Sequence, residues 1–478
     1  MASINLTESM TSKASVENKG RLSSDMCVVL YFSLGVFVYA LLVSFLLQTV
    51  VIPRVFSNPD AVKGLVVLDS IGFDGVARVK AEEIARNGWS AWELRPSGHM
   101  PAGIASAFYT IWKPVPYSVL PFNALVHAIA AGVTLLILRS FFLKLPALLG
   151  ALVFALNPAA MEWVAQIHRD GVFICGNLMF VFAMIKLNAK VNDNDNSCCR
   201  IAIAMLLAVA IFGIGIVWIA RPYWIQVMML SSVMCFFISA IDMKSSWAKQ
   251  TRVCGVLRML GVATLILLQV WIVRSYGQFE PVDMSLVPSF GMPRGEEDGA
   301  HSASMSWVRT AWIPDFMEER LYRIAISRRS VLAHGGGSVI DSDRFFQSGV
   351  EVIAYIPRAL QVGVLSPFPS LWAGQASTSA MVVGRKIVGG ATFLFYICLV
   401  GSAVSFVKMR AWPGVWTMVV LCLIGILVYA MTYPNIGTLM RYRYGFYMLI
   451  VAFGAAYWSS IFFKLRHEAR SSPLKVLP

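Results

Sequence analysis

Charged side chains are scarce in this chain. Asp, Glu, Lys and Arg make up 14% of its 478 residues, hydrophobic residues make up 57%, and the mean hydropathy is +0.67. Soluble domains are about 25% charged and about 45–50% apolar, so the composition excludes an ordinary soluble protein. The first hydrophobic run, Cys27 to Ile52, is too long for a signal peptide core and has no small-residue cleavage site. We expect it to stay as a membrane anchor.

Nucleotide-binding motifs are also lacking. The sequence has no G-x-G-x-x-G fingerprint and no P-loop, which argues against a bound nucleotide. The net charge of +14 comes from short clusters of Lys and Arg between apolar runs, not from one basic face. That placement is typical of membrane topology and argues against a nucleic-acid partner.

Ten apolar runs have the length of about 17–25 residues that a helix needs to cross the hydrocarbon core. We therefore predict an all-α polytopic membrane protein with about ten transmembrane helices. The expected helices begin near Cys27, Leu120, Pro146, Gly171, Ile201, Tyr223, Leu257, Lys386, Trp412 and Tyr444.

The Lys and Arg clusters set the expected orientation, because basic residues are enriched in cytoplasmic segments. With both termini cytoplasmic, every inside segment carries basic residues and two long segments lie outside, where we expect any chemistry. In a bacterium the membrane is then the inner membrane and the outside is the periplasm. The predicted parts are a cytoplasmic tail 1–26, a transmembrane domain 27–275 with a first outside loop 53–119, a large outside loop 276–385, and C-terminal helices with a short cytoplasmic tail 386–478.

Some patterns that suggest a metal or a disulfide are better explained without one. All eight cysteines fall in predicted spans or inside segments, so no disulfide bond is expected. Cys198 and Cys199 have no His or second Cys pair near them, which favours two free thiols over a metal site. Asp341-Ser342-Asp343 matches the D-x-D pattern of nucleotide-sugar transferases, but those enzymes carry it on a Rossmann-like domain, which this chain lacks.

The first outside loop carries the clearest motif. It contains Asp69 and Asp74, then Gly88 fourteen residues after Asp74, then His99-Met100-Pro101. An acidic residue after the first membrane helix, a short helix ending in Gly and a His-x-Pro segment resemble the GT-C fold glycosyltransferases that use polyprenyl-phosphate-linked sugars. That group includes protein O-mannosyltransferases and the aminoarabinose transferases that modify lipid A. The resemblance covers about the first 190 residues and implies a GT-C-like bundle and a lipid-linked sugar donor.

The resemblance also implies one carboxylate as general base, since the departing phosphate is already stable and the acceptor only has to lose a proton. Its spacing to Gly88 makes Asp74 the match to the family's acid, although Asp is also favoured as a helix N-cap. Asp69 either shares the site or faces solvent. Asp170 is expected to orient the acceptor or help hold a divalent cation, or else to pair with Arg169. The metal requirement is left open.

Arginines outside the membrane run against the positive-inside bias and need another explanation. Arg441 and Arg443 lie in a short turn before the last helix, where their planar forks can pair with a donor phosphate or with acids of the large loop. Further candidates for the donor phosphate are His99, Arg169, Arg221 and Arg358.

Two parts of the large loop are expected to be ordered. Trp307 to Arg329 has the pattern of an amphipathic helix, and Val352 to Trp372 is apolar but interrupted by Pro. We expect the second stretch to lie in the membrane interface, where it could wall a groove for the prenyl chain.

Two other classes of function stay open. A transporter or flippase of polyprenyl-linked glycans needs ionisable or broken-helix positions near mid-span, whereas the spans here are nearly free of charge. A polysaccharide polymerase or ligase also uses polyprenyl-linked substrates. The expected partners are a polyprenyl-phosphate-linked sugar, membrane lipids and an acceptor, which is a lipid, a protein such as pilin, or a polysaccharide.

Overall fold

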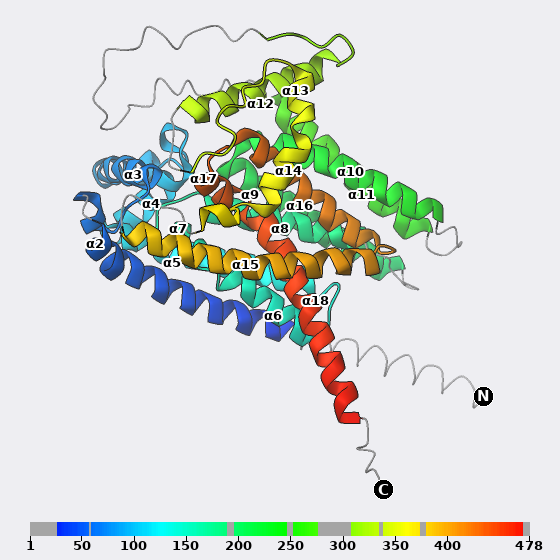
Figure 1. Ribbon diagram of the computed structural model, residues 1–478. Helices are drawn as coiled ribbons and strands as arrows, with labels where there is room; N and C mark the ends of the chain where they lie inside the picture. Colours follow the sequence, from blue (N-terminus) through cyan, green and yellow to red (C-terminus); the bar gives the residue numbers. More distant parts are fainter. Residues whose placement is uncertain are drawn as a thin grey trace. The chain divides into compact units, whose positions relative to one another are not determined.

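The fold is described from a computed structural model, over residues 26–56, 59–188, 196–245, 252–275, 307–333, 338–372 and 379–471. Most residues in these ranges are helical, and the β-structure within them is limited to two isolated bridges, Val308 with Ser348 and Val339 with Asn435 (Figure 1). Residues 1–25 of the expected tail 1–26 and much of the expected outside loop 276–385 lie outside the described residues.

Nine helices within the described ranges are long and apolar enough to cross a membrane. A tenth span is possible where Lys144–Ala155 and Pro158–Val164 form a pair bent by 49°. Each of the ten predicted starts has a counterpart, so the prediction of a multi-pass all-α membrane protein is confirmed. The nine spans are Met26–Val55, Pro116–Leu138, Asp170–Leu187, Arg200–Ala220, Pro222–Ile241, Gly255–Ser275, Val388–Lys408, Pro413–Thr432 and Tyr444–Leu465.

The bend between α6 (Lys144–Ala155) and α7 (Met161–Val164) has a local cause. Pro158 has no N–H to continue the hydrogen bonds of α6. Asn157 instead accepts a hydrogen bond from the backbone N–H of Ala159 at 3.1 Å and starts the short 3₁₀ helix η6 (Pro158–Ala160). The chain therefore turns here and leads into residues 165–170, which form part of the candidate site.

The chain forms two compact units, each described by itself. Unit 1 comprises Met1–Phe182, Cys398–Ser405 and Val451–Pro478, and unit 2 comprises Ala183–Ile397 and Phe406–Ile450. Unit 1 contains η1 (Leu47–Val51), α2 (Ile52–Val55), η2 (Pro59–Lys63), α3 (Leu68–Asn87), η3 (Trp89–Ala91), η4 (Pro96–Gly98), α4 (Met100–Ile111), η5 (Pro116–Val119), α5 (Leu120–Leu138), α6, α7 and most of α8 (Asp170–Leu187).

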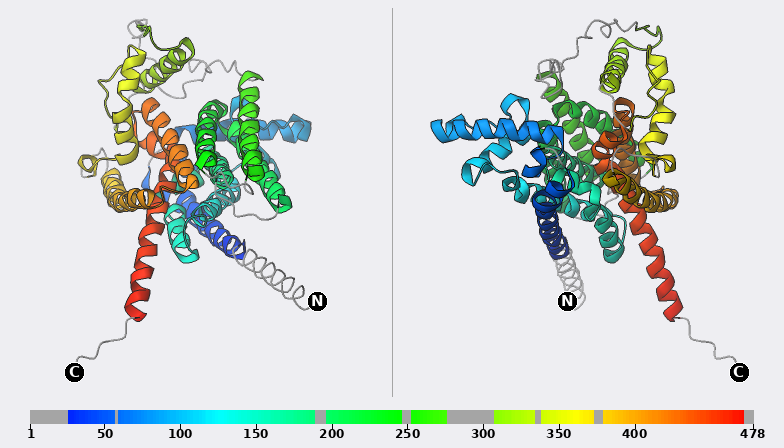
Figure 2. Two further views of the ribbon diagram at one scale, coloured as in Figure 1. Left: turned by 90° about the vertical axis from the view of Figure 1, so that its right-hand side faces the viewer. Right: turned by 60° about the vertical axis from the view of Figure 1, so that its left-hand side comes forward.

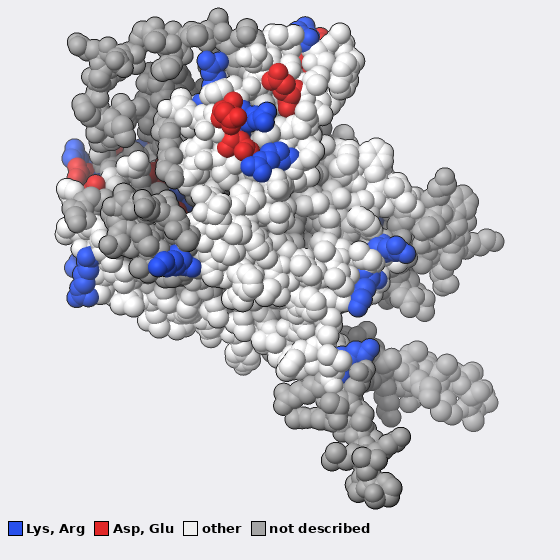
Figure 3. Space-filling model, in the orientation of Figure 1, with Lys and Arg blue, Asp and Glu red and all other residues white. Residues whose placement is uncertain are grey.

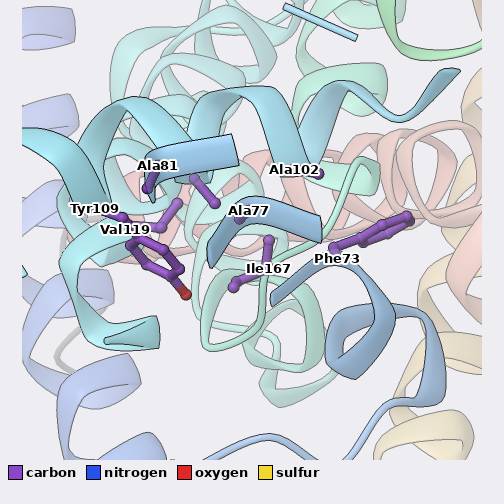
Figure 4. Close-up of a cluster of buried hydrophobic side chains, with 8 residues drawn as sticks. Phe73, Ala77, Ala81, Ala102, Tyr109, Val119 and Ile167 are labelled. Carbon is purple, nitrogen blue, oxygen red and sulfur yellow. The ribbon is translucent and has the colours of Figure 1, made fainter. Parts of the chain in front are cut away.

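Two short helices outside the spans, α3 and α4, pack closely in unit 1. Ala77 and Ala81 lie one turn apart on α3, and Ala102 and Ala105 present small side chains from α4, so the helices approach closely. The buried cluster between them is completed by Phe73, Tyr109, Val119 and Ile167 (Figure 4). This platform fixes the direction of the α3 side chains that carry the acidic motif.

Unit 2 is built around α10 and α16. The helix α10 packs against α11, the two green helices that run side by side in Figure 2, and it also packs against α16, which contacts α14 and α12. The elements of unit 2 are α9 (Asn196–Ala220), η7 (Pro222–Trp224), α10 (Ile225–Ser245), α11 (Arg252–Ser275), α12 (Asp315–Ala333), α13 (Gly349–Ala354), α14 (Ile356–Leu365), η9 (Pro369–Leu371) and α16 (Pro413–Thr432), with α17 (Ile436–Tyr442) and parts of α15 (Ser379–Lys408) and α18 (Tyr444–Ser471).

The helix expected from Trp307 begins later, at Asp315, directly after Pro314. Trp307 is not helical and donates a hydrogen bond to the buried carboxylate of Glu318 at 3.0 Å. The Pro-interrupted stretch forms α13, α14 and η9, as its pattern indicates. Charged side chains gather over α12 to α14 in Figure 3, whereas the surface over α16 is white in the same view.

Of the cysteines whose side chains are described, Cys27, Cys175, Cys235, Cys398 and Cys422 are free thiols. The side chains of Cys198, Cys199 and Cys254 lie outside the described residues.

Candidate active site

Buried amide side chains join the segment before α3 to the segment before α8. Gln166 donates a hydrogen bond to the carbonyl of Gly64 at 2.8 Å and accepts one from the backbone N–H of Val66 at 3.1 Å. Asn123 of α5 donates to the carbonyls of Val164, at 3.1 Å, and Gln166, at 2.8 Å. Two chain segments about one hundred residues apart are therefore held together in unit 1.

Gly64 is required at this junction. Its φ is +78°, a left-handed conformation that favours glycine, and a Cβ there would lie 2.2 Å from the carbonyl oxygen of Gln48. Gln48 in turn donates to the carbonyl of Ala165 at 2.8 Å. The end of the first span thus contacts both segments and fixes the start of α3 beside residues 165–170.

His168 lies between two carboxylates, and it is a site residue that the sequence analysis did not name. Its Nδ1 is 3.1 Å from Oδ2 of Asp170, and both side chains are 1% exposed. Its Nε2 is 3.7 Å from Oδ2 of Asp69, whose side chain is 45% exposed. Asp170 is the first residue of α8 and Asp69 lies in the first turn of α3, where helix dipoles favour negative charge. The structure therefore brings Asp69 and Asp170 together around one imidazole.

Asp74, the expected general base, has a different environment. It is 3% exposed, its Oδ1 accepts a hydrogen bond from the Tyr109 hydroxyl at 2.5 Å, and its Oδ2 accepts one from Nε of Arg78 at 2.8 Å. Burial, followed by the charge of Asp74, raises the pKa of Tyr109, and the hydrogen bond to Asp74 raises the pKa of Arg78. The bond to Oδ1 thus joins α3 to α4, and the bond to Oδ2 lies within α3.

The alternative interpretation of Asp74 as a helix N-cap is wrong. The helix α3 begins at Leu68, so Asp74 lies in its second turn, and the N-cap is Val67. The predicted end of the helix is correct, because α3 stops at Gly88, which has a φ of +80° and donates its N–H to the carbonyl of Ile84 at 2.8 Å.

Three basic side chains, Arg95, His99 and Arg169, form what we call the cationic cluster. All three are half-buried. Burial lowers the pKa of His99, the nearby Arg169 and Arg95 lower it further, and Asp69 acts in the opposite direction. Burial and then Arg169 lower the pKa of Arg95. Arg169 therefore acts on both other members of the cluster, and Asp69 acts on His99.

Phe73 connects the cationic cluster to the buried His168. Its ring is 7% exposed, with its centroid 5.2 Å from that of His99 and 6.4 Å from that of His168. Phe73 lies one helical turn after Asp69 on α3, so both side chains are on the same side of the helix. Arg95 was not among the predicted site residues; its only sequence signal is its place among the arginines of the first outside loop.

In unit 2, Arg443 caps a helix. It is 1% exposed and donates hydrogen bonds to the carbonyls of Val362, at 3.3 Å, Gly363 and Ser366. These carbonyls lie at the C-terminal end of α14, where the last helical carbonyls need partners. Its guanidinium is therefore used inside the fold, while binding of the donor phosphate by Arg443 stays a prediction.

Arg221 and Arg358 are also engaged within unit 2. Arg221 is 0% exposed, donates to the Tyr429 hydroxyl at 2.8 Å and lies 4.0 Å from the centroid of the Tyr442 ring. Arg358 forms two hydrogen bonds with the carboxylate of Asp341, at 2.9 and 3.0 Å. These arrangements support structural roles and not phosphate binding, and they also explain Asp341 of the D-x-D pattern.

Arg441 keeps its place among the candidates. Its side chain is half-buried, and its guanidinium carbon lies 5.2 Å from the centroid of the Tyr442 ring. No group of three or more His, Cys, Asp or Glu within the described ranges is arranged to hold a metal ion.

No protein-family model matches the chain, and no curated protein matches it. Over 94% of its length the chain is similar to a structure of the archaeal oligosaccharyltransferase AglB from Archaeoglobus fulgidus in complex with an inhibitory peptide and a dolichol-phosphate, with 15% identity and a TM-score of 0.46. Over 92% of its length it is similar to the apo form of the Archaeoglobus fulgidus oligosaccharyltransferase, with 13% identity and a TM-score of 0.47. The chain spans about half the length of these proteins, 52% in each case.

Proposed function

We propose that this membrane protein is a glycosyltransferase that moves a sugar from a polyprenyl-phosphate carrier to an acceptor on the outer face of the membrane. The observation that carries the proposal is the exposed carboxylate of Asp69, 3.7 Å from His168, which directly precedes the half-buried Arg169 in the chain. A group that accepts a proton and groups that hold a phosphate are the two requirements of this reaction.

The proposed reaction is a single displacement at the anomeric carbon of the donor sugar. The acceptor oxygen or nitrogen forms a bond to C1, and the bond between C1 and the phosphate oxygen breaks. The lipid phosphate leaves with the electron pair, and the acceptor's proton passes to the carboxylate of Asp69. Attack from the side opposite the leaving group inverts the configuration at C1.

Asp69 suits the role of base better than Asp74. Its side chain is 45% exposed, so an acceptor can reach it, whereas Asp74 is buried and holds Tyr109 and Arg78. His168, which is held by the buried Asp170, contacts Asp69 from the protein side. We therefore assign the base to Asp69 and a positioning role to Asp170 and His168.

His99 and Arg169 are the proposed donor-phosphate ligands in unit 1. Burial and two neighbouring guanidinium groups lower the pKa of His99, which favours the neutral ring at physiological pH. A neutral imidazole can still donate a hydrogen bond to a phosphate oxygen, while Arg169 supplies a permanent charge. In unit 2, Arg441 stays a proposed phosphate ligand.

The experiment that tests this proposal supplies the purified protein, in lipid nanodiscs, with radiolabelled polyprenyl-phosphate sugars and with membrane fractions as the source of acceptor. We expect the label to move from the lipid to a chemically distinct acceptor, with release of the polyprenyl phosphate. A polymerase would instead lengthen a lipid-linked glycan. A flippase would move the labelled lipid across proteoliposomes with no change in its covalent structure, and either result would contradict the proposal.

A further inference from the structure

The segment that carries Arg95 is pinned to the α3–α4 platform. Glu93 forms an ion pair with Lys80 of α3 at 2.8 Å, and Lys80 is 7% exposed. The indole of Trp92 donates to the carbonyl of Gly103 on α4 at 2.9 Å. The segment before Arg95 is therefore held by contacts to both α3 and α4, so Arg95 does not lie in a freely exposed loop.

The backbone just before Arg95 also presses on α4. A Cβ at Gly103 would lie 2.2 Å from the carbonyl oxygen of Leu94. Only glycine at this helix position leaves room for the segment, so the sequence permits the close approach that half-buries Arg95.

The guanidinium of Arg95 lacks the partners that a half-buried charge normally has. Its Nε is buried and has no hydrogen-bond acceptor in the described part of the protein, and the same holds for Nε of Arg169. Within those residues neither arginine forms an ion pair with an acidic side chain. The two groups repel each other, since Arg169 lowers the pKa of Arg95. Leaving buried charges without a partner costs free energy, so an anionic ligand would relieve the arrangement.

We propose that Arg95, together with Arg169, binds the phosphate of the lipid carrier and stabilises the second negative charge that develops on it as the sugar departs. This inference rests on the proposed function and adds a residue to it.

Charge arithmetic supports two guanidinium groups at this position. A polyprenyl-phosphate sugar is a phosphodiester with one negative charge, and the polyprenyl phosphate released from it is a monoester that carries up to two. Both charges of the leaving group can then face a permanent cation, while the neutral His99 adds a hydrogen bond. Contacts that strengthen as the charge develops lower the barrier more than they tighten donor binding. Arg95 should therefore affect turnover more than the donor KM.

The test uses farnesyl phosphate as a short probe of the leaving group, bound to the full chain in nanodiscs. Arg95→Gln should weaken its binding by about 10- to 100-fold, the range for losing a charge-assisted hydrogen bond. Arg95→Lys should restore part of the affinity. The matched control is Arg86→Gln on α3, because Arg86 is 75% exposed and pairs only with Glu82 at the surface. Farnesol, which has no charge, should bind all variants equally.

The outcomes separate the two proposals. Unchanged binding of farnesyl phosphate in Arg95→Gln, with normal folding, overturns the inference about Arg95. A second outcome is that Arg95→Gln abolishes the binding of farnesyl phosphate while the protein transfers no sugar from any donor. This result would support the anion site and reject the glycosyltransferase function. In an active enzyme we expect kcat to fall more than the donor KM rises, and equal kcat values for Arg95→Gln and Arg86→Gln would also reject the role of Arg95.

Discussion

Nδ1 of His168 lies 3.1 Å from the carboxylate of Asp170, and both side chains are almost completely buried. The pair stands at the start of α8 and contacts Asp69, which the sequence places one hundred residues earlier. A buried carboxylate beside an imidazole fixes the orientation of the ring, as carboxylates do for histidines in many sites.

Loss of this pair should slow turnover without weakening donor binding. We expect Asp170→Asn and His168→Gln each to lower kcat by about tenfold or more, because positioning of the base is disturbed while the cationic cluster is intact. Initial rates at varied donor concentrations give kcat and KM separately. The matched control is His127→Gln, since His127 is also buried in unit 1 but lies near the carbonyl of Ala155, at 3.0 Å, and pairs with no acid in the described residues. An equal fall in kcat for His127→Gln would contradict a specific positioning role of His168.

Asp74 should matter more for stability than for chemistry. Asp74→Asn leaves Arg78 without its charged partner and weakens the bond from Tyr109, so we expect a loss of about 1–3 kcal/mol in the free energy of unfolding. Tyr109→Phe should cost less, since the ion pair with Arg78 is kept. Unfolding of the purified protein in detergent measures both effects. A fully stable Asp74→Asn protein with no turnover would instead return the role of base to Asp74.

Arg443 and Arg441 should give opposite results despite their closeness in sequence. Arg443→Gln removes the cap of α14, and the loss should appear as a lower melting temperature with the donor KM of the folded fraction unchanged. Arg441→Gln should raise the donor KM and change the melting temperature little. A raised KM with normal stability in Arg443→Gln would show that the phosphate, and not α14, is its main partner.

The predicted orientation is tested by labelling. Ser90, exposed after α3, and Leu143, 76% exposed between α5 and α6, lie at opposite ends of the predicted topology. In a variant without native cysteines, Ser90→Cys should react with a membrane-impermeant thiol reagent in intact cells, and Leu143→Cys should react only after the membrane is opened. The reverse pattern would place the candidate site on the cytoplasmic side.

The spans could be predicted from the sequence because their signal is local. Apolar runs of sufficient length gave all ten starts, and Gly88 correctly marked the end of α3. The sequence analysis predicted one span starting near Pro146 and did not predict the bend after α6, although Asn157-Pro158 is a local signal for a bend.

The roles of Asp69 and Asp74 could be distinguished only once the first residue of α3 was known. With the helix beginning at Leu68, Asp69 and Asp74 lie on different faces of α3, and Asp74 faces Tyr109 of α4. Because the sequence analysis started the helix after Asp74, it did not separate these two faces.

The remaining site residues depend on contacts that no sequence spacing reveals. His168 meets Asp69 only because Gln166 and Gly64 join segments far apart in the chain. The sequence shows Arg443 only as one of two arginines in a turn. It does not reveal that Arg443 bonds to the end of α14, about eighty residues earlier.

The most direct test of the central claim compares Asp69→Asn with Asp60→Asn in the sugar-transfer assay. Asn keeps the size of the side chain but cannot accept the acceptor's proton, and Asp60 is an acid of the same loop whose carboxylate pairs with Lys63 at 3.5 Å. We predict that Asp69→Asn lowers kcat by about 10² or more with normal stability, the range of general-base loss, while Asp60→Asn transfers sugar at the wild-type rate. Equal rates for the two variants and the wild-type protein would contradict the assignment of Asp69 as the base.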